Sequence, residues 1–445
     1  MRCRPVAGGN GPGHGADPGT LMLVVSANWS IGDGTLVGGG RARIRDWLVA
    51  VHRAAVRSGW RGDGGYAPLD ALDVVLAGDT LDLLSSAAWL GVARPWDRGG
   101  RADAVRERVM LAATKRAMPL LAGLARWARD GVALPRAGRH HRPLPQELVR
   151  VPVRVTLLAG DRDRWLPLAV RRAARAGLRL GEAWSNDAVV VAHGAGCDPA
   201  CFEEPHERVG RLPGGRPTLA ESVAVDFVAR FVRELPQEDG PAPATRGLRE
   251  RLAAATVGEV AGIFSAWLRS EPGGAAALGT RRAVVAAWQR AAEAWGRAAR
   301  RTGVDTGCEF DGIDAVATTL AAAVRDEHRG DTGWLRCEPR PAPLPAPLAA
   351  AAAELVVLGH PPAGPAGAPA PVGIVPLPGR RPLIVCLGGR SAVEPPRPGH
   401  GFRSAWPAPT GLACRRRRGT LVVEPVQPGE NADPAAGVAV AGEAA

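Results

Sequence analysis

Short apolar runs, each followed within a few residues by polar side chains, constrain the fold of this chain most strongly. The runs are Leu21–Val25, Leu72–Leu76, Val153–Leu158, Ala188–Val191 and Leu355–Leu358. Their length and β-branched content are typical of strands buried on both faces of a sheet. Residues that follow parallel strands meet at one edge of the sheet, where open α/β sheets bind ligands. The sequence therefore predicts an α/β fold with one composite site.

The segments after these runs carry side chains that can bind metal ions. They read Asn28-Trp29-Ser30, Gly78-Asp79-Thr80-Leu81-Asp82, Gly160-Asp161-Arg162-Asp163, His193-Gly194 and Gly359-His360-Pro361-Pro362. Carboxylate oxygens suit hard divalent cations, and imidazole is added where a borderline metal such as Mn²⁺, Fe²⁺ or Zn²⁺ is used. The pattern favours a metal site made from several loops.

The order and spacing of the segments resemble the calcineurin-like metallophosphoesterases, whose pattern is D-x-H, GDxxD, GNH[DE], a lone His and GHxH. Only GDxxD is intact, as Asp79 and Asp82. The stretch from His193 to Pro199 is most similar to the branch related to UDP-2,3-diacylglucosamine diphosphatase. The resemblance covers roughly residues 21–210 and 351–425. It implies a β-sandwich core flanked by helices and two adjacent cation sites.

By this resemblance, four residues would bind the second cation. Asp79 stands at the shared Asp, Asp161 replaces the Asn of GNH, His193 is the lone His and His360 is the first His of GHxH. Asp161 adds negative charge where the family has a neutral amide. All four side chains are competent metal donors.

The first-cation positions are degenerate. Asn28 replaces the Asp of D-x-H, Ser30 replaces its His, and Pro362 replaces the final His of GHxH. Proline has no side-chain donor and serine is a poor neutral one, so we expect one divalent cation, Mn²⁺, Zn²⁺ or Fe²⁺, instead of two. Asp33 or Asp163 as a replacement ligand remains an open alternative, and Asp82 and Asp163 are expected to support the site.

Arg162 stands where the family has the His of GNH, which by resemblance protonates the leaving group or steadies the transition state. A guanidinium stays charged and cannot act as a general acid. It can bind a phosphate oxygen through two parallel hydrogen bonds. This replacement favours a site that holds a phosphate more readily than it cleaves one.

The pattern between the two matching regions is purely helical and predicts an insertion or cap. We expect a disordered N-terminus at 1–20, a first core part at 21–215, a helical insertion at 216–345, a second core part at 346–428 and a disordered tail at 429–445. Expected helices are Arg41–Ser58, Ala102–Ala128, Leu166–Ala176, Ala220–Glu234, Thr245–Ala255, Val257–Leu268, Arg281–Arg301 and Ile313–Asp326. Residues 338–350 and 361–372 read as Pro/Ala-rich linkers.

The chain of 445 residues has a formal net charge of +12 and a pI near 10.7, almost all of it from arginine. Such charge suits an anionic partner, but arginine spread over a solvated surface explains it better. Two local alternatives are a small zinc site at His193, Cys197, Cys201 and His206, and a basic loop at Arg415–Arg418. Without interleaved aromatic residues, we expect no nucleic-acid partner.

The sequence predicts a cytoplasmic protein. Its seven cysteines do not form a secreted disulfide framework, residues 1–20 lack an apolar signal region, and no apolar stretch reaches the ~20 residues that span a bilayer. Peripheral membrane contact stays compatible with the sequence. Expected partners are a phosphorylated small molecule or a lipid-linked phosphate.

Three functions are open at this stage. The first is a metal-dependent phosphoester or pyrophosphate hydrolase by ancestry, with weak or lost turnover, that is, a pseudoenzyme candidate. The second is a non-catalytic phosphate-binding or scaffold protein on the same fold. The third is an unrelated α/β binding protein, in which Asp79, Asp161, His193 and His360 would not converge.

Overall fold

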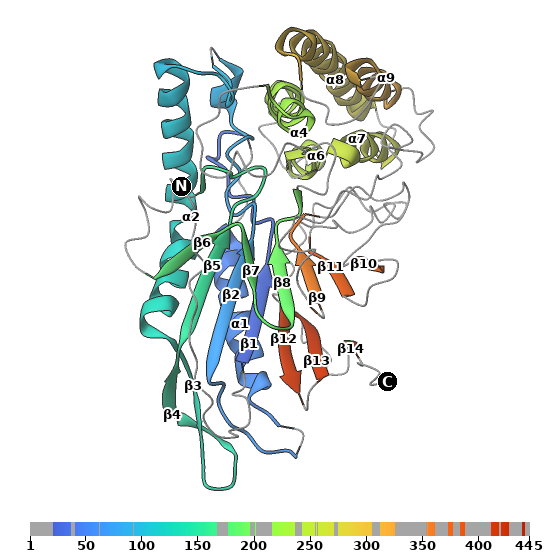
Figure 1. Ribbon diagram of the computed structural model, residues 1–445. Helices are drawn as coiled ribbons and strands as arrows, with labels where there is room; N and C mark the ends of the chain where they lie inside the picture. Colours follow the sequence, from blue (N-terminus) through green and yellow to red (C-terminus); the bar gives the residue numbers. More distant parts are fainter. Residues whose placement is uncertain are drawn as a thin grey trace.

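The computed structural model describes residues 21–36, 41–61, 63–91, 93–166, 177–195, 201, 216–235, 243–253, 255, 257–270, 275–304, 312–324, 353, 355–360, 373–376, 383–387, 411–417, 420–426 and 438–440. They form a mixed α/β structure with two large sheets and a group of helices (Figure 1). The α/β class is therefore confirmed. The expected disordered N-terminus, both linkers and nearly all of the helix predicted at Leu166–Ala176 lie outside the described residues.

The larger sheet has seven strands in the order β14-β13-β12-β1-β2-β5-β6. Strands β1, β2, β5 and β6 are parallel, while β12, β13 and β14 extend the sheet in antiparallel fashion. The strands are β1 (Leu21–Ser26), β2 (Ala71–Ala77), β5 (Val153–Leu158), β6 (Leu178–Gly181), β12 (Gly411–Arg417), β13 (Thr420–Val426) and β14 (Val438–Val440). The tail at 429–445 was expected to be disordered, but its residues Val438–Val440 form strand β14, which pairs with β13.

The smaller sheet has five strands in the order β10-β11-β9-β8-β7. Strands β8, β9 and β11 are parallel, and the two edge strands are antiparallel to their neighbours. The strands are β7 (Ala183–Ser185), β8 (Val189–Ala192), β9 (Leu355–Leu358), β10 (Gly373–Pro376) and β11 (Leu383–Cys386). Segments that precede and follow the helical insertion thus pair in one sheet.

The two sheets pack against each other through alternate residues of their strands. Leu23 and Val25 of β1 share a buried cluster with Val191 and Val357 of the smaller sheet. Met22 and Val24 point to the opposite face and join a second cluster with helices α1 (Arg41–Ser58) and α2 (Gly100–Asp130). This alternation follows from the period of two in a strand.

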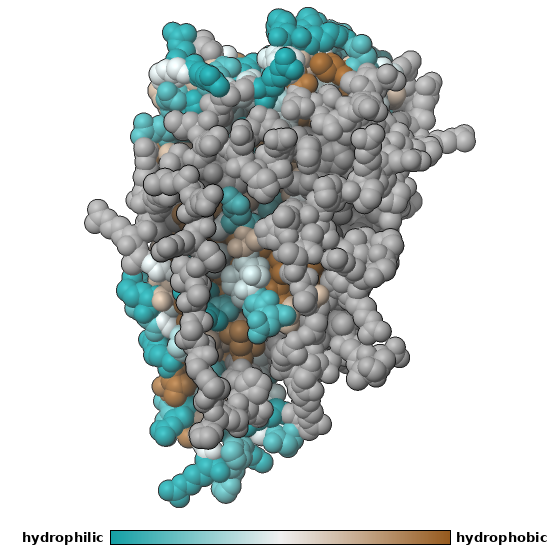
Figure 2. Space-filling view, viewed as in Figure 1, coloured by the Kyte–Doolittle hydropathy of each residue, from teal (hydrophilic) through white to brown (hydrophobic). Residues whose placement is uncertain are grey.

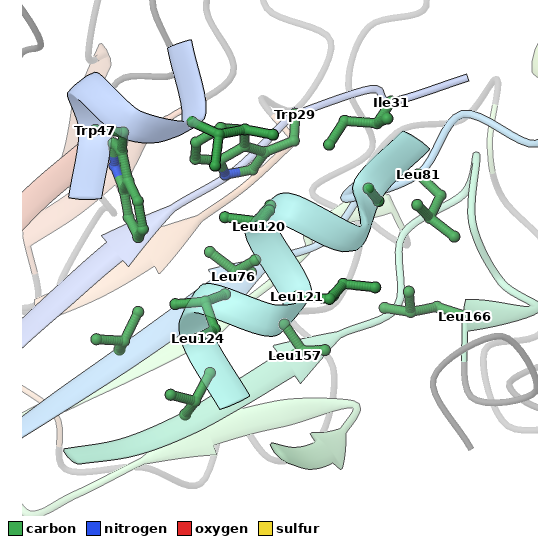
Figure 3. Packing of buried hydrophobic residues seen from close by; sticks show 14 of the residues in the cluster. Trp29, Ile31, Trp47, Leu76, Leu81, Leu120, Leu121, Leu124, Leu157 and Leu166 are labelled. Carbon is green, nitrogen blue, oxygen red and sulfur yellow. The ribbon is translucent and has the colours of Figure 1, made fainter. Parts of the chain in front are cut away.

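Aromatic and leucine side chains fill the layer between the larger sheet and the helices. Figure 3 shows Leu120 and Leu124 of α2 beside Leu76 and Leu157, which come from strands β2 and β5. Trp47 of α1 meets Trp29 edge to face, with ring centroids 5.2 Å apart. The loop that carries Trp29 is thereby fixed next to the sheet.

A two-stranded hairpin that the sequence analysis did not predict extends from the end of α2. It consists of β3 (Val132–Ala137) and β4 (Pro143–Val151), which pair with a register shift after Pro135. Much of β4 is exposed, and hydrophilic side chains cover the lower end of the molecule in Figure 2. Its proline and arginine content masks the alternation that would otherwise indicate strands.

The helical block, residues 216–324, lies over the carboxyl ends of the parallel strands (Figure 1). Its helices are α4 (Leu219–Ser222), a π-helical segment (Val223–Ala229), α5 (Arg230–Glu234), α6 (Pro243–Ala253), α7 (Val257–Ser270), α8 (Ala275–Thr302) and α9 (Gly312–Ala322). A capping box between Thr218 and Glu221 begins the first helix. Phe227, Phe264 and Trp288 are buried in the block's own core, so these aromatic residues stabilise the block itself.

Among the described residues, no helix combines the length and apolarity that crossing a bilayer requires.

Candidate metal centre

Four side chains from both sheets converge at the carboxyl ends of the strands. Asp79 follows β2, Asp161 follows β5, His193 follows β8 and His360 follows β9. One ligand atom of each lies within 4.8 Å of those of the other three. The four residues predicted to bind a cation are therefore brought together, and this cluster can hold a metal ion.

The distances within the cluster suit a shared central ligand. His193 Nε2 lies 3.4 Å from Asp79 Oδ2 and 3.6 Å from Asp161 Oδ1. His360 Nδ1 is also 3.6 Å from Asp161 Oδ1, and the two imidazole centroids are 5.4 Å apart. These separations are longer than good hydrogen bonds between the same groups. They surround a central position that all four candidate ligand atoms face.

Buried polar atoms without hydrogen-bond partners indicate which kind of ligand fits this central position. Asp161 Oδ1 and both ring nitrogens of His193 are buried and have no hydrogen-bond partner. Buried polar atoms in folded proteins are nearly always bonded, and exceptions occur where an ion is bound. Two carboxylates and two imidazoles are a donor set for a borderline divalent cation. The residues present therefore fit a metal ion.

The carboxylates and imidazoles of the cluster shift one another's proton affinities. Burial opposes ionisation of Asp79, but the charge and contact of His193 lower its pKa to about 2. Burial and the Asp79 carboxylate raise the pKa of Asp161. Burial alone would lower the pKa of His193, yet Asp79 raises it. Asp79 is thus the most acidic of these three groups, and its carboxylate raises the pKa of both Asp161 and His193.

Glycines let the ligand loops approach closely. A Cβ on Gly160 would lie 2.1 Å from Asp79 Oδ1 and 2.8 Å from His193 Nε2. Gly78 has a φ of 92°, and a Cβ there would lie 2.0 Å from His193 Cδ2. Any side chain at these two positions would displace the ligands.

Asp82 and Asp163 fasten the loops instead of facing the cluster. Asp163 accepts hydrogen bonds from the backbone N–H groups of Leu81 at 3.0 Å and Gly160 at 2.6 Å. Burial and the Asp79 carboxylate raise its pKa to about 7. Asp82 Oδ1 accepts from the N–H of Ser85 at 3.0 Å. These contacts give both residues a supporting role.

Asp33 is also engaged away from the cluster. One of its carboxylate oxygens accepts from the Thr35 backbone N–H at 2.9 Å and the other from the Ser86 hydroxyl. The predicted alternative, in which Asp33 or Asp163 replaces a missing ligand, therefore has no support in this geometry.

Asn28 and Ser30, which the resemblance puts at the positions of the first cation, lie beside the cluster. Asn28 Nδ2 donates to the Gly359 carbonyl at 2.8 Å, and the Ser30 N–H donates to the Asp79 carbonyl at 2.8 Å. Asn28 and Ser30 have positive φ values of 57° and 46°, which place them over the end of β2. Pro362 lies outside the described residues.

Arg162 is largely buried beside the cluster, and its guanidinium points to the helical block. Its Nη1 donates to Asp82 Oδ2 at 3.1 Å and to the Ala253 carbonyl at 2.5 Å. Its Nη2 donates to the Ala255 carbonyl at 2.6 Å. No residue pattern could have indicated these two carbonyl partners, because every residue type carries the same backbone carbonyl.

A cavity of about 40 Å³ connects the cluster to the helical block. At its polar end lie Asn28, Ser30, Asp79, Asp161, Arg162 and His360. Its other walls are mostly apolar and come largely from the helical block, among them Val223, Leu252, Val257 and Val260, although Ser85 and Glu259 also line it. A ligand in this cavity would touch both the cluster and the block.

The two local alternatives fare differently. Cys197 and His206 of the small zinc site lie outside the described residues, while His193 belongs to the Asp/His cluster and Cys201 lines the cavity. Arg415–Arg417 lie in strand β12, not in a loop. This correction has a simple cause: β12 pairs on both sides, so its backbone contacts outweigh the polar side chains.

Comparisons with known proteins found no match to this chain. No family model, no curated protein and no solved structure matches it.

Proposed function

We propose that this chain is a metallophosphoesterase-type protein that binds one divalent cation and a phosphate ester, with slow hydrolysis. The observation that carries this proposal is the convergence of Asp79, Asp161, His193 and His360 within 4.8 Å. The residue types, their order along the chain and their place after parallel strands are those that the calcineurin-like resemblance implies. Two packed sheets with helices outside them also suit that family's sandwich.

One cation is proposed instead of two because of what surrounds the cluster. Asp79 Oδ1 accepts the Arg162 backbone N–H at 3.0 Å, which leaves Oδ2 as its metal-binding oxygen. Asn28 uses its amide nitrogen on a backbone carbonyl, and Ser30 offers only a neutral hydroxyl. Mn²⁺, Zn²⁺ and Fe²⁺ all accept a donor set of this kind.

A bound cation would supply positive charge for a phosphoryl oxygen and lower the pKa of a coordinated water. The chain's own residues orient the ester: the cluster fixes the phosphate end, and the walls from the helical block exclude water from the rest. Among the described residues that line the cavity, the one imidazole belongs to the cluster, Arg162 stays protonated, and the carboxylate outside the cluster, Glu259, lies on α7 of the helical block. Because Arg162 stands where the family has its histidine, the leaving group is proposed to depart slowly.

The replacement of the family's histidine by Arg162 also favours the second candidate function, a non-catalytic phosphate binder. The two candidates differ in turnover alone. A simple phosphorylated metabolite and a lipid-linked phosphate are both compatible with a polar end and apolar walls.

The test is metal analysis combined with a phosphodiesterase assay on purified protein. We expect about one bound equivalent of metal per chain, a ratio that a single-cation site dictates. His193→Ala should lose the metal, while His52→Ala, whose ring contacts the Ala133 carbonyl away from the site, should keep it. Metal-dependent cleavage of bis-p-nitrophenyl phosphate that disappears in Asp79→Ala would support slow hydrolysis. If the wild type binds metal but shows no cleavage, the result would support the non-catalytic phosphate binder. A metal-free wild type after exposure to all three cations would refute both.

A further inference from the structure

Three arginines of the sheet-based core contact the helical block. Arg162 donates to the carbonyls of Ala253 and Ala255, as described above. Arg94 Nε lies 2.6 Å from Asp226 Oδ1, and Arg164 forms an ion pair with Glu221. The partners Asp226 and Glu221 are both buried. The block is therefore attached to the core by polar contacts as well as by apolar packing.

The contact made by Arg162 lies at the end of a helix. Helix α6 ends at Ala253, and the last carbonyls of a helix have no partner within the helix. The carboxyl end of a helix also carries partial negative charge, so a guanidinium there is favourable. Ser85 Oγ donates to the same Ala253 carbonyl at 3.4 Å. Core side chains thus satisfy the carbonyls of Ala253 and Ala255, which with Val257 are the described residues of the α6–α7 junction.

This junction forms one wall of the cavity. Ala253, Ala255 and Val257 line it together with Asp79 and Asp161. Arg162 is joined to the cluster as well, because it directly follows Asp161 and its backbone N–H bonds to Asp79 Oδ1. A single residue therefore links a predicted metal ligand to the cavity wall.

We infer that Arg162 is a positioning residue, which holds the α6–α7 junction over the Asp/His cluster, and that it is not a direct phosphate ligand. Three of its hydrogen bonds are made to protein groups, and its side chain is only 12% exposed. Only the identity of the ligand in the cavity, a metal-bound phosphate ester, rests on the proposed function. The attachment of the junction itself is independent of any metal.

Hydrogen–deuterium exchange of the full chain tests this inference. Arg162→Lys keeps the positive charge beside Asp79, Asp82 and Asp161 but cannot reach both carbonyls. We expect about tenfold faster exchange in peptides from α6 and the start of α7, the factor that corresponds to one charge-assisted hydrogen bond. Strands β1, β2 and β5 should exchange as in the wild type. In Arg162→Ala the effect should be larger, and added methylguanidinium should reverse it.

The matched control is Arg94→Lys, which weakens a different contact to the same block. It should raise exchange in Val223–Ala229 and leave α6 unchanged, because Arg94 pairs with Asp226. Unchanged exchange of α6 in both Arg162 variants would overturn the inference. So would loss of phosphate-induced thermal stabilisation in Arg162→Lys with α6 still protected, since that result would make Arg162 a phosphate ligand. If Arg162→Ala does not fold, Arg162→Lys alone decides. Metal content, measured on the same samples, reports separately on the proposed function.

Discussion

The Asp79 carboxylate and the His193 imidazole lie 3.4 Å apart although they follow strands of different sheets. Asp79 follows β2 of the seven-stranded sheet, and His193 follows β8 of the five-stranded sheet. The same division holds for Asp161, after β5, and His360, after β9. A cation at this point would therefore join the two sheets as well as bind a ligand.

Metal removal should lower the stability of the wild type. A cation that binds only the folded state stabilises it by about 2.7 kcal/mol when its free concentration is a hundred times Kd. We expect a lower melting temperature in EDTA than in Mn²⁺ or Zn²⁺, measured by circular dichroism. In His193→Ala the two curves should coincide. A wild type that melts identically with and without metal would contradict the site.

Asp161→Asn should change stability in opposite directions with and without metal. Asp161 Oδ1 is buried without a hydrogen-bond partner, next to the Asp79 carboxylate. In EDTA the neutral amide removes this repulsion and should stabilise the fold by about 1 kcal/mol. With metal present the variant should be the less stable protein, because one anionic ligand is lost. Thermal melts of both proteins in both buffers measure these stabilities. A variant with a lower melting temperature than the wild type in both buffers would contradict the proposed repulsion between Asp161 and Asp79.

The strands and helices near the site could be predicted because their sequence patterns are strong. The helix predicted at Arg41–Ser58 has those bounds in the structure, and the strands before Asp79, Asp161, His193 and His360 all exist. Each strand is rich in valine and leucine and most of its positions are buried, so burial and propensity agree. The convergence of the four side chains then follows from the parallel strand direction.

Other features could not be predicted, for identifiable reasons. Strand β12 contains Arg415–Arg417, whose charges resemble a loop, yet it pairs with β1 and β13. The β3–β4 hairpin carries Pro135 and several arginines, which obscure alternation. Arg162 was expected to face a phosphate, and its carbonyl partners depend on how α6 packs, which residue type does not encode. The residue pattern thus indicated which four side chains converge better than it indicated their surroundings.

Gly160→Ala should abolish metal binding and also lower the stability of the fold. A Cβ at this position would lie 2.1 Å from Asp79 Oδ1 and 2.6 Å from the Asp79 backbone nitrogen, so both the carboxylate and its loop must move. The matched control is Gly279→Ala in α8, where a Cβ would meet nothing within 4 Å. Because alanine favours helices, that variant should gain up to about 1 kcal/mol. Metal titration by calorimetry and urea unfolding check both, and tight metal binding by Gly160→Ala would refute the close approach.

The paired residues Asp73 and Arg154 should show measurable coupling across the larger sheet. They face each other on β2 and β5, and two hydrogen bonds of 2.5 and 2.6 Å join them. Asp73 is buried while the Arg154 side chain is 48% exposed, so solvent screens the pair. A double-mutant cycle with Asp73→Asn and Arg154→Gln should give a coupling of about 1 kcal/mol. Additive effects in urea unfolding would mean that the contact does not contribute.

Cys414 should resist alkylation for as long as the chain is folded. It lies in β12 opposite Leu23 and is 2% exposed, and burial raises the pKa of its thiol to about 12. Since the thiolate is the reactive form, only roughly one part in ten thousand of this thiol is ionised at pH 8, against a substantial fraction for an ordinary cysteine near 8.5. Raising the pH from 7 to 9 should therefore leave the native protein unmodified at this position. Mass spectrometry of the Cys414 peptide after iodoacetamide treatment measures this. Modification in urea provides the control, and rapid modification without urea would show that the β1–β12 pairing opens in solution.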